Sequence, residues 1–229
     1  MGAPFLSIVV PIYNEERVID RLLDQLRPLR ETCEVILVDG GSTDGTLARI
    51  DDAFTVIRAP KGRGGQLNAG ARAATGAVLL FLHADSVLPL DPVGEIERVM
   101  RTHRVGCFGV RFEPSSPLMR ICAALSNFRC YVRRIMFGDQ GIFIERALFL
   151  EVGGFPDLPL MEDYRFSLDL RRRGLRPGAT RGRITTSARR FGTTTRSRLR
   201  TMMQMAHLRR LYRRGAPIEE IARRYGEAR

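Results

Sequence analysis

Three short apolar runs rich in branched side chains lie in the first part of the chain, and each ends in polar or turn-forming residues. They cover residues 6–12, 34–38 and 77–82. Such runs are typical of strands buried in a parallel sheet. Helical patterns separate them, over residues 15–30, 42–50 and 65–75, with a further short strand at 54–57. This alternation predicts an α/β fold, with an open, mostly parallel sheet and helices on both faces.

The residues that directly follow these strands are the first candidates for a binding site. In open parallel sheets, ligands bind outside the carboxyl ends of the strands. Here those positions hold Asn14, Asp39 and Asp85. Each also has a structural explanation, because Asn14 and Asp85 suit helix caps and Asp39 suits the start of a turn. Three such positions in one chain nevertheless indicate a polar, acidic site at one edge of the sheet.

The second half of the chain is less regular. Helices are expected over residues 91–102, 117–134 and 162–173, and a strand over 107–112. In the long helix, apolar residues recur at helical spacing on a face that we expect to point inward. They are Leu118, Ile121, Leu125 and Phe128. An arginine-rich helical segment follows, so we divide the chain into a main domain, residues 1–190, and a basic helical C-terminal extension, residues 191–229.

Charge and composition set further limits. The 229 residues carry a formal net charge of +12, and Lys61 is the only lysine. A positive surface favours anionic partners such as a phosphorylated ligand or a lipid surface, although a solvated face explains the same excess. No apolar run approaches the roughly 20 residues that cross a bilayer, so neither a spanning helix nor a signal peptide is expected. Four cysteines without CxxC spacing indicate reduced thiols and a cytoplasmic protein.

Known phosphate-binding motifs are weak or absent. The turn after the first strand, residues 11–15, has no glycine, which argues against a dinucleotide site, and no Walker loop occurs. The same lack of a basic, glycine-rich loop disfavours a nucleotidyltransferase. Residues 62–65 precede a helix and suit a phosphate, but a flexible loop explains them equally. There is no helix-turn-helix or zinc motif, so no nucleic acid is expected as a substrate.

Carboxylates at two positions suit catalysis. Asp85 follows a buried strand and is a candidate ligand for Mg²⁺ or Mn²⁺. His83 projects to the same side if the segment is extended, and imidazole suits Mn²⁺ better, although a lone histidine is also explained by a structural hydrogen bond. Glu162 and Asp163 lie where a loop enters a helix, whose dipole keeps them ionised. Helix capping explains this pair, and a general base is its functional interpretation.

Five motifs, in this order, resemble family 2 of the inverting glycosyltransferases, which have the GT-A fold. They are SIVVPIYNEE at 7–16, EVILVDGGSTDGT at 34–46, LNAG at 67–70, LFLHAD at 80–85, and GGF at 153–155 with MED at 161–163. The resemblance covers roughly residues 5–175. Further strings are similar to a bacterial subgroup that is associated with radical-SAM or selenium-domain neighbours and named for arsenosugar biosynthesis: residues 137–141, 159–164 and 186–191.

The resemblance implies a nucleotide-diphosphate sugar donor, UDP- or GDP-linked, in a Rossmann-like half of the fold. Its base and ribose would contact the first two strand ends, at Pro11, Tyr13, Glu15 and Asp39. The rest of the donor would be approached by Gly65, Asn68, His83, Ala84 and Asp85. Asp85 would hold a Mn²⁺ or Mg²⁺ ion that bridges the diphosphate. Asp163, beside Glu162, would deprotonate the acceptor, and the sugar would be transferred with inversion.

One motif departs from the family pattern. The usual aspartate-any-aspartate metal motif reads His83-Ala84-Asp85 here, which leaves open whether His83 replaces a metal ligand. The Gln-x-x-Arg-Trp motif of processive synthases is absent, but Arg189 and Arg190 are candidates to neutralise the diphosphate. The acceptor, a small molecule or a lipid-linked one, is unidentified. Candidates to contact it are Asp139, Gln140 and Tyr164.

Two functions therefore compete. The first is transfer of a single sugar by a cytoplasmic enzyme. The second is a catalytically degenerate fold that acts as a binding module for anionic lipid or nucleic acid, which His83 and the basic tail favour. Apolar residues of the tail suit an interfacial helix: Leu199, Met202, Met203, Ala206 and Leu211. This composition is compatible with peripheral attachment to the inner face of the membrane and with a homo-oligomer, while packing on the core is the structural alternative.

Overall fold

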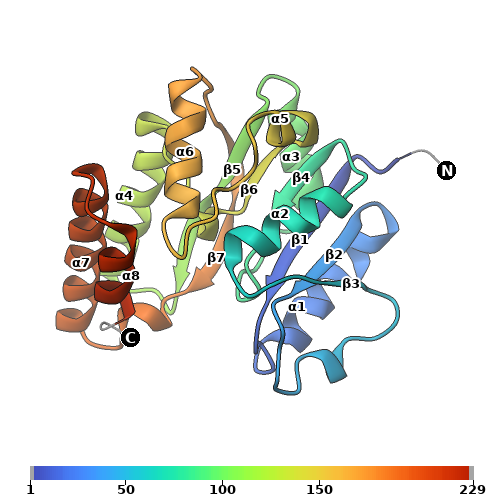
Figure 1. Ribbon diagram of the computed structural model, residues 1–229, viewed down its shortest axis with the longest axis horizontal. Coiled ribbons are helices and arrows are strands. Elements are labelled where there is room, and N and C mark those ends of the chain that lie inside the picture. The colour runs from blue at the N-terminus through green and yellow to red at the C-terminus, as the bar shows by residue number, and fades with distance from the viewer. Residues whose placement is uncertain (1–2, 227–229) are drawn as a thin grey trace.

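The computed structural model describes residues 3–226, which form a seven-stranded sheet and flanking helices (Figure 1). The strands are β1 (Leu6–Ile12), β2 (Glu34–Asp39), β3 (Thr55–Arg58), β4 (Val78–Phe81), β5 (Val105–Glu113), β6 (Ile142–Glu145) and β7 (Gly178–Ser187). The α-helices are α1 (Ile19–Leu26), α2 (Arg63–Ala73), α3 (Pro92–Met100), α4 (Pro117–Arg133), α5 (Arg146–Glu151), α6 (Glu162–Arg172), α7 (Thr195–Arg213) and α8 (Ile218–Gly226).

The strands follow the order β3-β2-β1-β4-β6-β5-β7. β1 pairs in parallel with β2 and β4, and β2 with β3, whereas β6 runs antiparallel to both of its neighbours. β7 is parallel to β5. Helices cover both faces of the sheet (Figure 1), so the predicted α/β fold is confirmed. Because β2, β1 and β4 are adjacent and parallel, the loops after them meet at one edge of the sheet.

The sheet separates two hydrophobic cores, and a third cluster attaches the C-terminal helices. In β1, Val10 packs into the core beneath α1, and its neighbour Val9, on the opposite face of the sheet, packs into the core beneath α2. The third cluster joins α6 to α7 and α8 through Tyr164, Leu208 and Ile221. The basic tail is therefore packed on the main body, while its treatment as a separate extension from residue 191 stays a prediction. No helix within residues 3–226 is long and apolar enough to cross a membrane.

The segment 42–50 is a loop that ends in a short 3₁₀ turn (Leu47–Arg49), so the helix predicted there is wrong. Its polar side chains bond to nearby groups, which competes with helix formation. Asp44 Oδ1 accepts from both the backbone N–H (3.0 Å) and the hydroxyl (2.5 Å) of Thr46. Thr46 Oγ1 accepts from the Glu15 N–H (2.7 Å). The same contacts hold the chain before α1, which begins at Ile19 rather than at residue 15.

The face of α4 that packs on the sheet is not the predicted one. Ile121, Leu125 and Phe128 are 54%, 54% and 51% exposed. The buried residues are Met119, Ala123, Ser126, Asn127 and Cys130. The cause is Asn127, which accepts from the Val110 N–H of β5 (2.8 Å) and donates to the Val110 carbonyl (3.2 Å). Because a buried amide costs free energy unless it is paired, these bonds fix the rotation of α4.

Two glycines of α2 provide a test of how closely this helix packs on the sheet. A Cβ at Gly70 would lie 2.3 Å from Val9 Cγ1 and 3.0 Å from Val38 Cγ2, whereas a Cβ at Gly65 would meet nothing within 4 Å. We expect Gly70→Ala to lower the free energy of unfolding by about 1–3 kcal/mol through overpacking. Gly65→Ala should leave it unchanged or raise it by up to about 1 kcal/mol. Urea denaturation of both variants checks this; equal effects would contradict the close approach.

Candidate active site

The loops after β1 and β2 are connected by their own side chains. Asn14, with a left-handed backbone (φ 54°), accepts at Oδ1 from the Thr43 N–H (2.8 Å) and donates its N–H to Ser42 Oγ (3.0 Å). Asp39 is 1% exposed, and its two carboxylate oxygens accept from the N–H groups of Gly41 (3.1 Å) and Ser42 (3.0 Å). Asp39 therefore shapes the turn after β2, and its contact with a donor base stays a prediction.

Gln66 of α2 holds the ends of β1 and β2 together. Its Nε2 donates to the carbonyls of Ile12 (3.0 Å) and Val38 (2.7 Å), and the side chain is 3% exposed. The close approach of Gly40 leaves room for this amide, since a Cβ there would lie 3.0 Å from Gln66 Nε2. Sequence patterns gave no signal for Gln66, because a glutamine in a helix is unremarkable until the two strand ends beneath it are known.

Tyr13 lies beside the only lysine of the chain. The Lys61 ammonium is 4.1 Å from the centre of the Tyr13 ring, a cation–π contact between the loop after β1 and the loop before α2. Tyr13 and Pro11 are both half-buried at the end of β1. The pair places a positive charge next to the aromatic ring, which suits an electron-rich or anionic ligand at this edge.

Asn68 connects α2 to the glycine turn that precedes α6. Its Nδ2 donates to the Phe155 carbonyl (2.8 Å), and its Oδ1 accepts from the Phe155 N–H (2.9 Å). Gly154, with φ 72°, lets the turn come close, since a Cβ there would lie 2.6 Å from Asn68 Oδ1. The amide is thus engaged with the backbone at both ends, which is a structural role, and the predicted contact of Asn68 with a donor stays untested.

A cavity of about 380 Å³ lies between the sheet edge, α4, α6 and α7. The side formed by the sheet edge and α6 is polar, and it contains five of the predicted residues: His83, Asp85, Asp139, Asp163 and Arg190. The side formed by α4 and α7 is mostly apolar and includes Cys122, Leu125, Met202, Met205 and Ala206. Three arginines that sequence reasoning missed also line it: Arg63, Arg129 and Arg209. Carboxylates and guanidinium groups therefore face an apolar wall.

Asp163 is held in place at the first turn of α6. Its Oδ2 accepts from the Gly138 N–H (2.8 Å), and its Oδ1 accepts from the N–H of Tyr164 (2.7 Å). Met161 precedes the helix with a left-handed backbone (φ 67°), which sets the angle at which the chain enters α6. Each carboxylate oxygen keeps a further lone pair, and Asp163 lines the cavity, so it can accept a hydrogen bond from a ligand there.

Glu162 does not line the cavity and is engaged elsewhere. It is 2% exposed and forms an ion pair with the Arg63 guanidinium, whose side chain lines the cavity. Burial and the neighbouring Asp163 charge raise the pKa of Glu162, and Arg63 opposes this shift. The geometry gives Glu162 the task of orienting Arg63, so of the predicted catalytic pair only Asp163 faces the cavity.

Asp139 lies in the 3₁₀ turn Gly138–Gln140 and lines the same cavity as Asp163. Burial and the Asp163 charge raise the pKa of Asp139 to about 6, and Arg129 and Arg63 oppose this shift. Arg129 also lies over the Phe137 ring at 4.3 Å. The cavity thus contains two carboxylates, and the pKa of one of them, Asp139, is raised.

His83 and Asp85 follow β4, and both line the cavity. His83 Nε2 is buried without a hydrogen-bond partner, and burial lowers the pKa of His83 to about 3, so the imidazole is neutral. Gly138 packs against it, since a Cβ there would lie 2.5 Å from Nε2. Within residues 3–226 no group of three or more metal-binding side chains occurs. An ion on these two donors would need diphosphate oxygens or water to complete its shell.

Glu15 and Arg189 lie outside the cavity lining, whereas Arg190 belongs to it. Burial raises the pKa of Glu15, and the Asp85 charge raises it further, whereas the Arg189 charge lowers it. Glu15 is therefore within electrostatic reach of both Asp85 and Arg189. Arg189 Nε donates to Ser187 Oγ (3.0 Å), and Arg190 lies 3.9 Å from the centre of the Tyr225 ring.

Gln140, Tyr164 and Ala84 are buried outside the cavity lining. Gln140 Oε1 accepts from the Phe137 N–H (3.2 Å) and so closes the turn that carries Asp139. The Tyr164 ring stacks on Phe137, with ring centres 5.7 Å apart, and packs edge-on against Tyr212 of α7. These residues support the cavity walls, and their predicted ligand contacts stay predictions.

The chain matches the family model described as "Glycosyl transferase family 2" over residues 7–140. It therefore belongs to glycosyl transferase family 2. A PGL/p-HBAD biosynthesis glycosyltransferase of Mycobacterium tuberculosis is 33% identical over 175 residues, which cover 68% of this chain and 64% of that protein. An uncharacterised glycosyltransferase of Synechocystis sp. is 38% identical over 90 residues, 38% of this chain and 28% of that protein. The match thus spans less than two thirds of these relatives.

Solved structures share the fold. The mannosyltransferase PcManGT from Pyrobaculum calidifontis, in complex with GDP-Man and Mn²⁺, superposes with a TM-score of 0.63 at 22% identity, over 84% of this chain and 59% of that one. A truncated Staphylococcus aureus TarS in complex with UDP-GlcNAc gives a TM-score of 0.62 at 20% identity, over 80% and 58% of the two chains. These neighbours confirm the GT-A-like fold that the sequence predicts.

The Arg63–Glu162 pair predicts a large difference between two arginine variants. Arg63→Ala leaves the buried Glu162 carboxylate without its partner, and we expect a loss of roughly 2–4 kcal/mol in the free energy of unfolding at neutral pH. Arg172→Ala removes an exposed partner of Asp169 (2.9 Å) and should cost less than about 1 kcal/mol. Chemical denaturation of both variants measures the difference. A loss at Arg63 no larger than at Arg172 would show that Glu162 does not depend on the pair.

Proposed function

We propose that this protein is an inverting glycosyltransferase that moves a single sugar from a nucleotide-diphosphate sugar, UDP- or GDP-linked, to an acceptor hydroxyl. The observation that carries the proposal is the position of Asp163, fixed by the Gly138 N–H in a cavity that also contains Asp85. Membership of glycosyl transferase family 2 supports the reaction class. The fold neighbours PcManGT and TarS, which bind GDP-Man and UDP-GlcNAc, support the choice of donors.

Asp163 is the general base of this proposal. It accepts the proton of the acceptor hydroxyl while the hydroxyl oxygen attacks the anomeric carbon from the face opposite the diphosphate. The bond between the anomeric carbon and the diphosphate oxygen breaks, and its electron pair leaves with the diphosphate. Arg63 and Arg190 line the same cavity, and their guanidinium groups suit the negative charge of that leaving group.

The donor lies along the carboxyl edge of β1, β2 and β4. Pro11 and Tyr13 border its base, with Lys61 beside Tyr13, while Asp39 and Glu15 lie near the base and ribose. The diphosphate extends past Gly65 and Ala84 toward Asp85. Two observations support this path: the three strands are adjacent in the sheet, and the Asp85 charge acts on Glu15.

Asp85 and His83 are the residues that would hold a divalent ion, Mn²⁺ or Mg²⁺. The unpartnered Nε2 of His83, which lines the same cavity as the Asp85 carboxylate, supports this assignment. When bound, such an ion neutralises charge on the leaving diphosphate. The Mn²⁺ in the PcManGT complex is consistent with the choice of metal.

The arsenosugar-type subgroup is part of the proposal as well. Its three strings, residues 137–141, 159–164 and 186–191, come from distant parts of the chain, and all three contribute residues to the cavity wall. Asp139, which lines the same cavity as Asp163, is the residue of these strings that we assign to the acceptor. The acceptor itself is a small molecule or a lipid-linked one, and we place the enzyme in the cytoplasm or on the inner face of the membrane.

Replacing the proposed general base, Asp163, separates donor binding from sugar transfer. Asp163→Asn keeps the shape of the side chain and removes its basicity, so we expect donor binding within about twofold of wild type and transfer lowered by about 10²–10⁴-fold. Single-turnover assays of sugar release from UDP- and GDP-sugars measure this. Asp169→Asn, an exposed position on the same helix, is the control and should retain full activity. Undiminished turnover in Asp163→Asn would exclude Asp163 as the base.

Donor and metal binding are tested together by thermal shift. UDP or GDP at about 100 times its dissociation constant stabilises the fold by roughly 2.7 kcal/mol. We expect that shift to require Mn²⁺ or Mg²⁺, to vanish with chelator, and to be lost in Asp85→Ala. Asp24→Ala, on the exposed side of α1, should keep it. If no nucleotide shifts the melting temperature under any condition, the degenerate binding module becomes the better explanation.

A further inference from the structure

The outer surface of α4 and α7 carries an exposed apolar face. Ile121, Leu125, Phe128 and Val132 recur at helical spacing along α4 and are 54%, 54%, 51% and 61% exposed. On α7, Leu199 and Met203 are 46% and 58% exposed. The two helices pack beside each other at one end of the molecule, as Figure 1 shows. We call these six side chains the α4–α7 face. A run of large apolar side chains on a surface is typical of a site that binds a partner.

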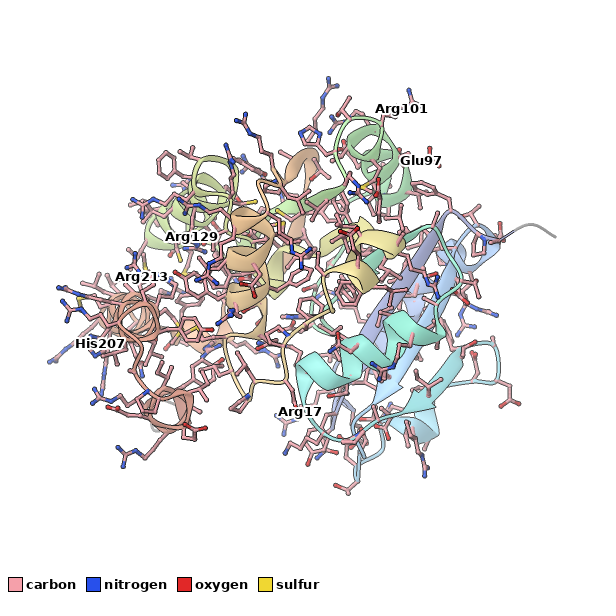
Figure 2. The ribbon with its side chains drawn as sticks, turned by 45° about the horizontal axis from the view of Figure 1, so that its top comes forward. Arg17, Glu97, Arg101, Arg129, His207 and Arg213 are labelled. Carbon is pink, nitrogen blue, oxygen red and sulfur yellow. The ribbon has the colours of Figure 1, made fainter. Side chains whose placement is uncertain are left out.

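The charges on the two helices that form this face all have one sign. Neither α4 nor α7 contains an aspartate or glutamate. Arg196 and Arg200 precede Leu199 and Met203 by three positions, so they are their neighbours on the surface of α7. The other arginines of the two helices are Arg120, Arg129 and Arg133 of α4, and Arg198, Arg209, Arg210 and Arg213 of α7. In Figure 2, Arg213 lies on the outer side of the molecule and Arg129 lies further in.

The face is continuous with the cavity. Leu125 belongs to both, and it lies in the cavity wall with Met202 and Ala206 of α7. An apolar path therefore connects the exposed side of α4 and α7 with the cavity that contains Asp163.

We propose that the α4–α7 face docks onto the surface of an anionic lipid bilayer. The apolar side chains would enter the boundary between headgroups and acyl chains, and the arginines would contact lipid phosphates. A second copy of the chain fits less well, because face-to-face contact would bring arginines against arginines. The proposal concerns attachment only, so it stands or falls independently of sugar transfer.

Vesicle co-sedimentation of the full chain tests the proposal. We expect binding to vesicles of phosphatidylglycerol mixed with phosphatidylcholine, weak binding to phosphatidylcholine alone, and weaker binding as salt rises. Ile121→Ser/Phe128→Ser should lower the partition coefficient at least tenfold or so, because it removes two apolar anchors. Arg196→Glu/Arg200→Glu should have an effect of similar size. All four side chains lie outside the cavity lining, so the thermal shift with nucleotide should stay unchanged.

Matched controls distinguish binding through this face from nonspecific hydrophobic adsorption and from the effect of net charge alone. Leu90→Ser/Leu150→Ser removes two exposed apolar side chains elsewhere, and Arg17→Glu/Arg101→Glu makes the same change in net charge far from α7 (Figure 2). Both controls should bind vesicles like the wild type. Equal losses in variants and controls, or no preference for anionic vesicles, would overturn the proposal. So would a dimer in light scattering that Ile121→Ser/Phe128→Ser dissociates, because the face would then cover a second copy.

Discussion

The ion pair between Arg63 and the buried Glu162 joins the first residue of α2 to the first residue of α6. α2 packs on β1 and β2, in the first half of the chain, whereas α6 belongs to the second half. The ion pair therefore connects the two halves of the chain. Burying the Glu162 carboxylate without its partner would cost free energy, so the arrangement that keeps Arg63 in contact with it is favoured. Asp163 is the residue after Glu162, and Arg63 itself lines the cavity. The ion pair therefore helps to position both Asp163 and Arg63 at the site. Asn68 and the Phe155 backbone make a second connection nearby.

The sequence was sufficient for five of the seven strands, all but β6 and β7, and for much of the polar side of the cavity. Apolar runs closed by polar residues predict parallel strands, and the ends of such strands must meet at one edge. For this reason His83 and Asp85 after β4 were recognisable without a structure. Asp163 was recognisable beside Glu162 at the start of a predicted helix. Asp139 lies on a less regular part of the chain, and resemblance to family motifs was the signal for it. The structure then places all four in one cavity.

Other features depend on packing that no local pattern contains. Arg63, Arg129 and Arg209 do not stand out in a chain whose positive charge is almost all arginine. Gln66 has a role only because two carbonyls lie beneath it. The rotation of α4 was predicted wrongly because both of its faces carry apolar residues, and a hydrogen-bonded Asn127 decides between them. A hydrophobic pattern measures how apolar a face is and cannot measure whether a buried amide finds its partners.

That rotation also has a consequence for the proposed reaction. With Asn127 turned toward β5, the large apolar residues of α4 face outward, and Leu125 is shared between the surface and the cavity wall. A sugar acceptor made only of polar groups would gain little from a wall of Leu125, Met202 and Ala206. An acceptor with a hydrocarbon part would bury that part against the wall while its hydroxyl reaches Asp163. Taken together, the proposed membrane attachment and the proposed base therefore favour the lipid-linked acceptor over the small soluble one.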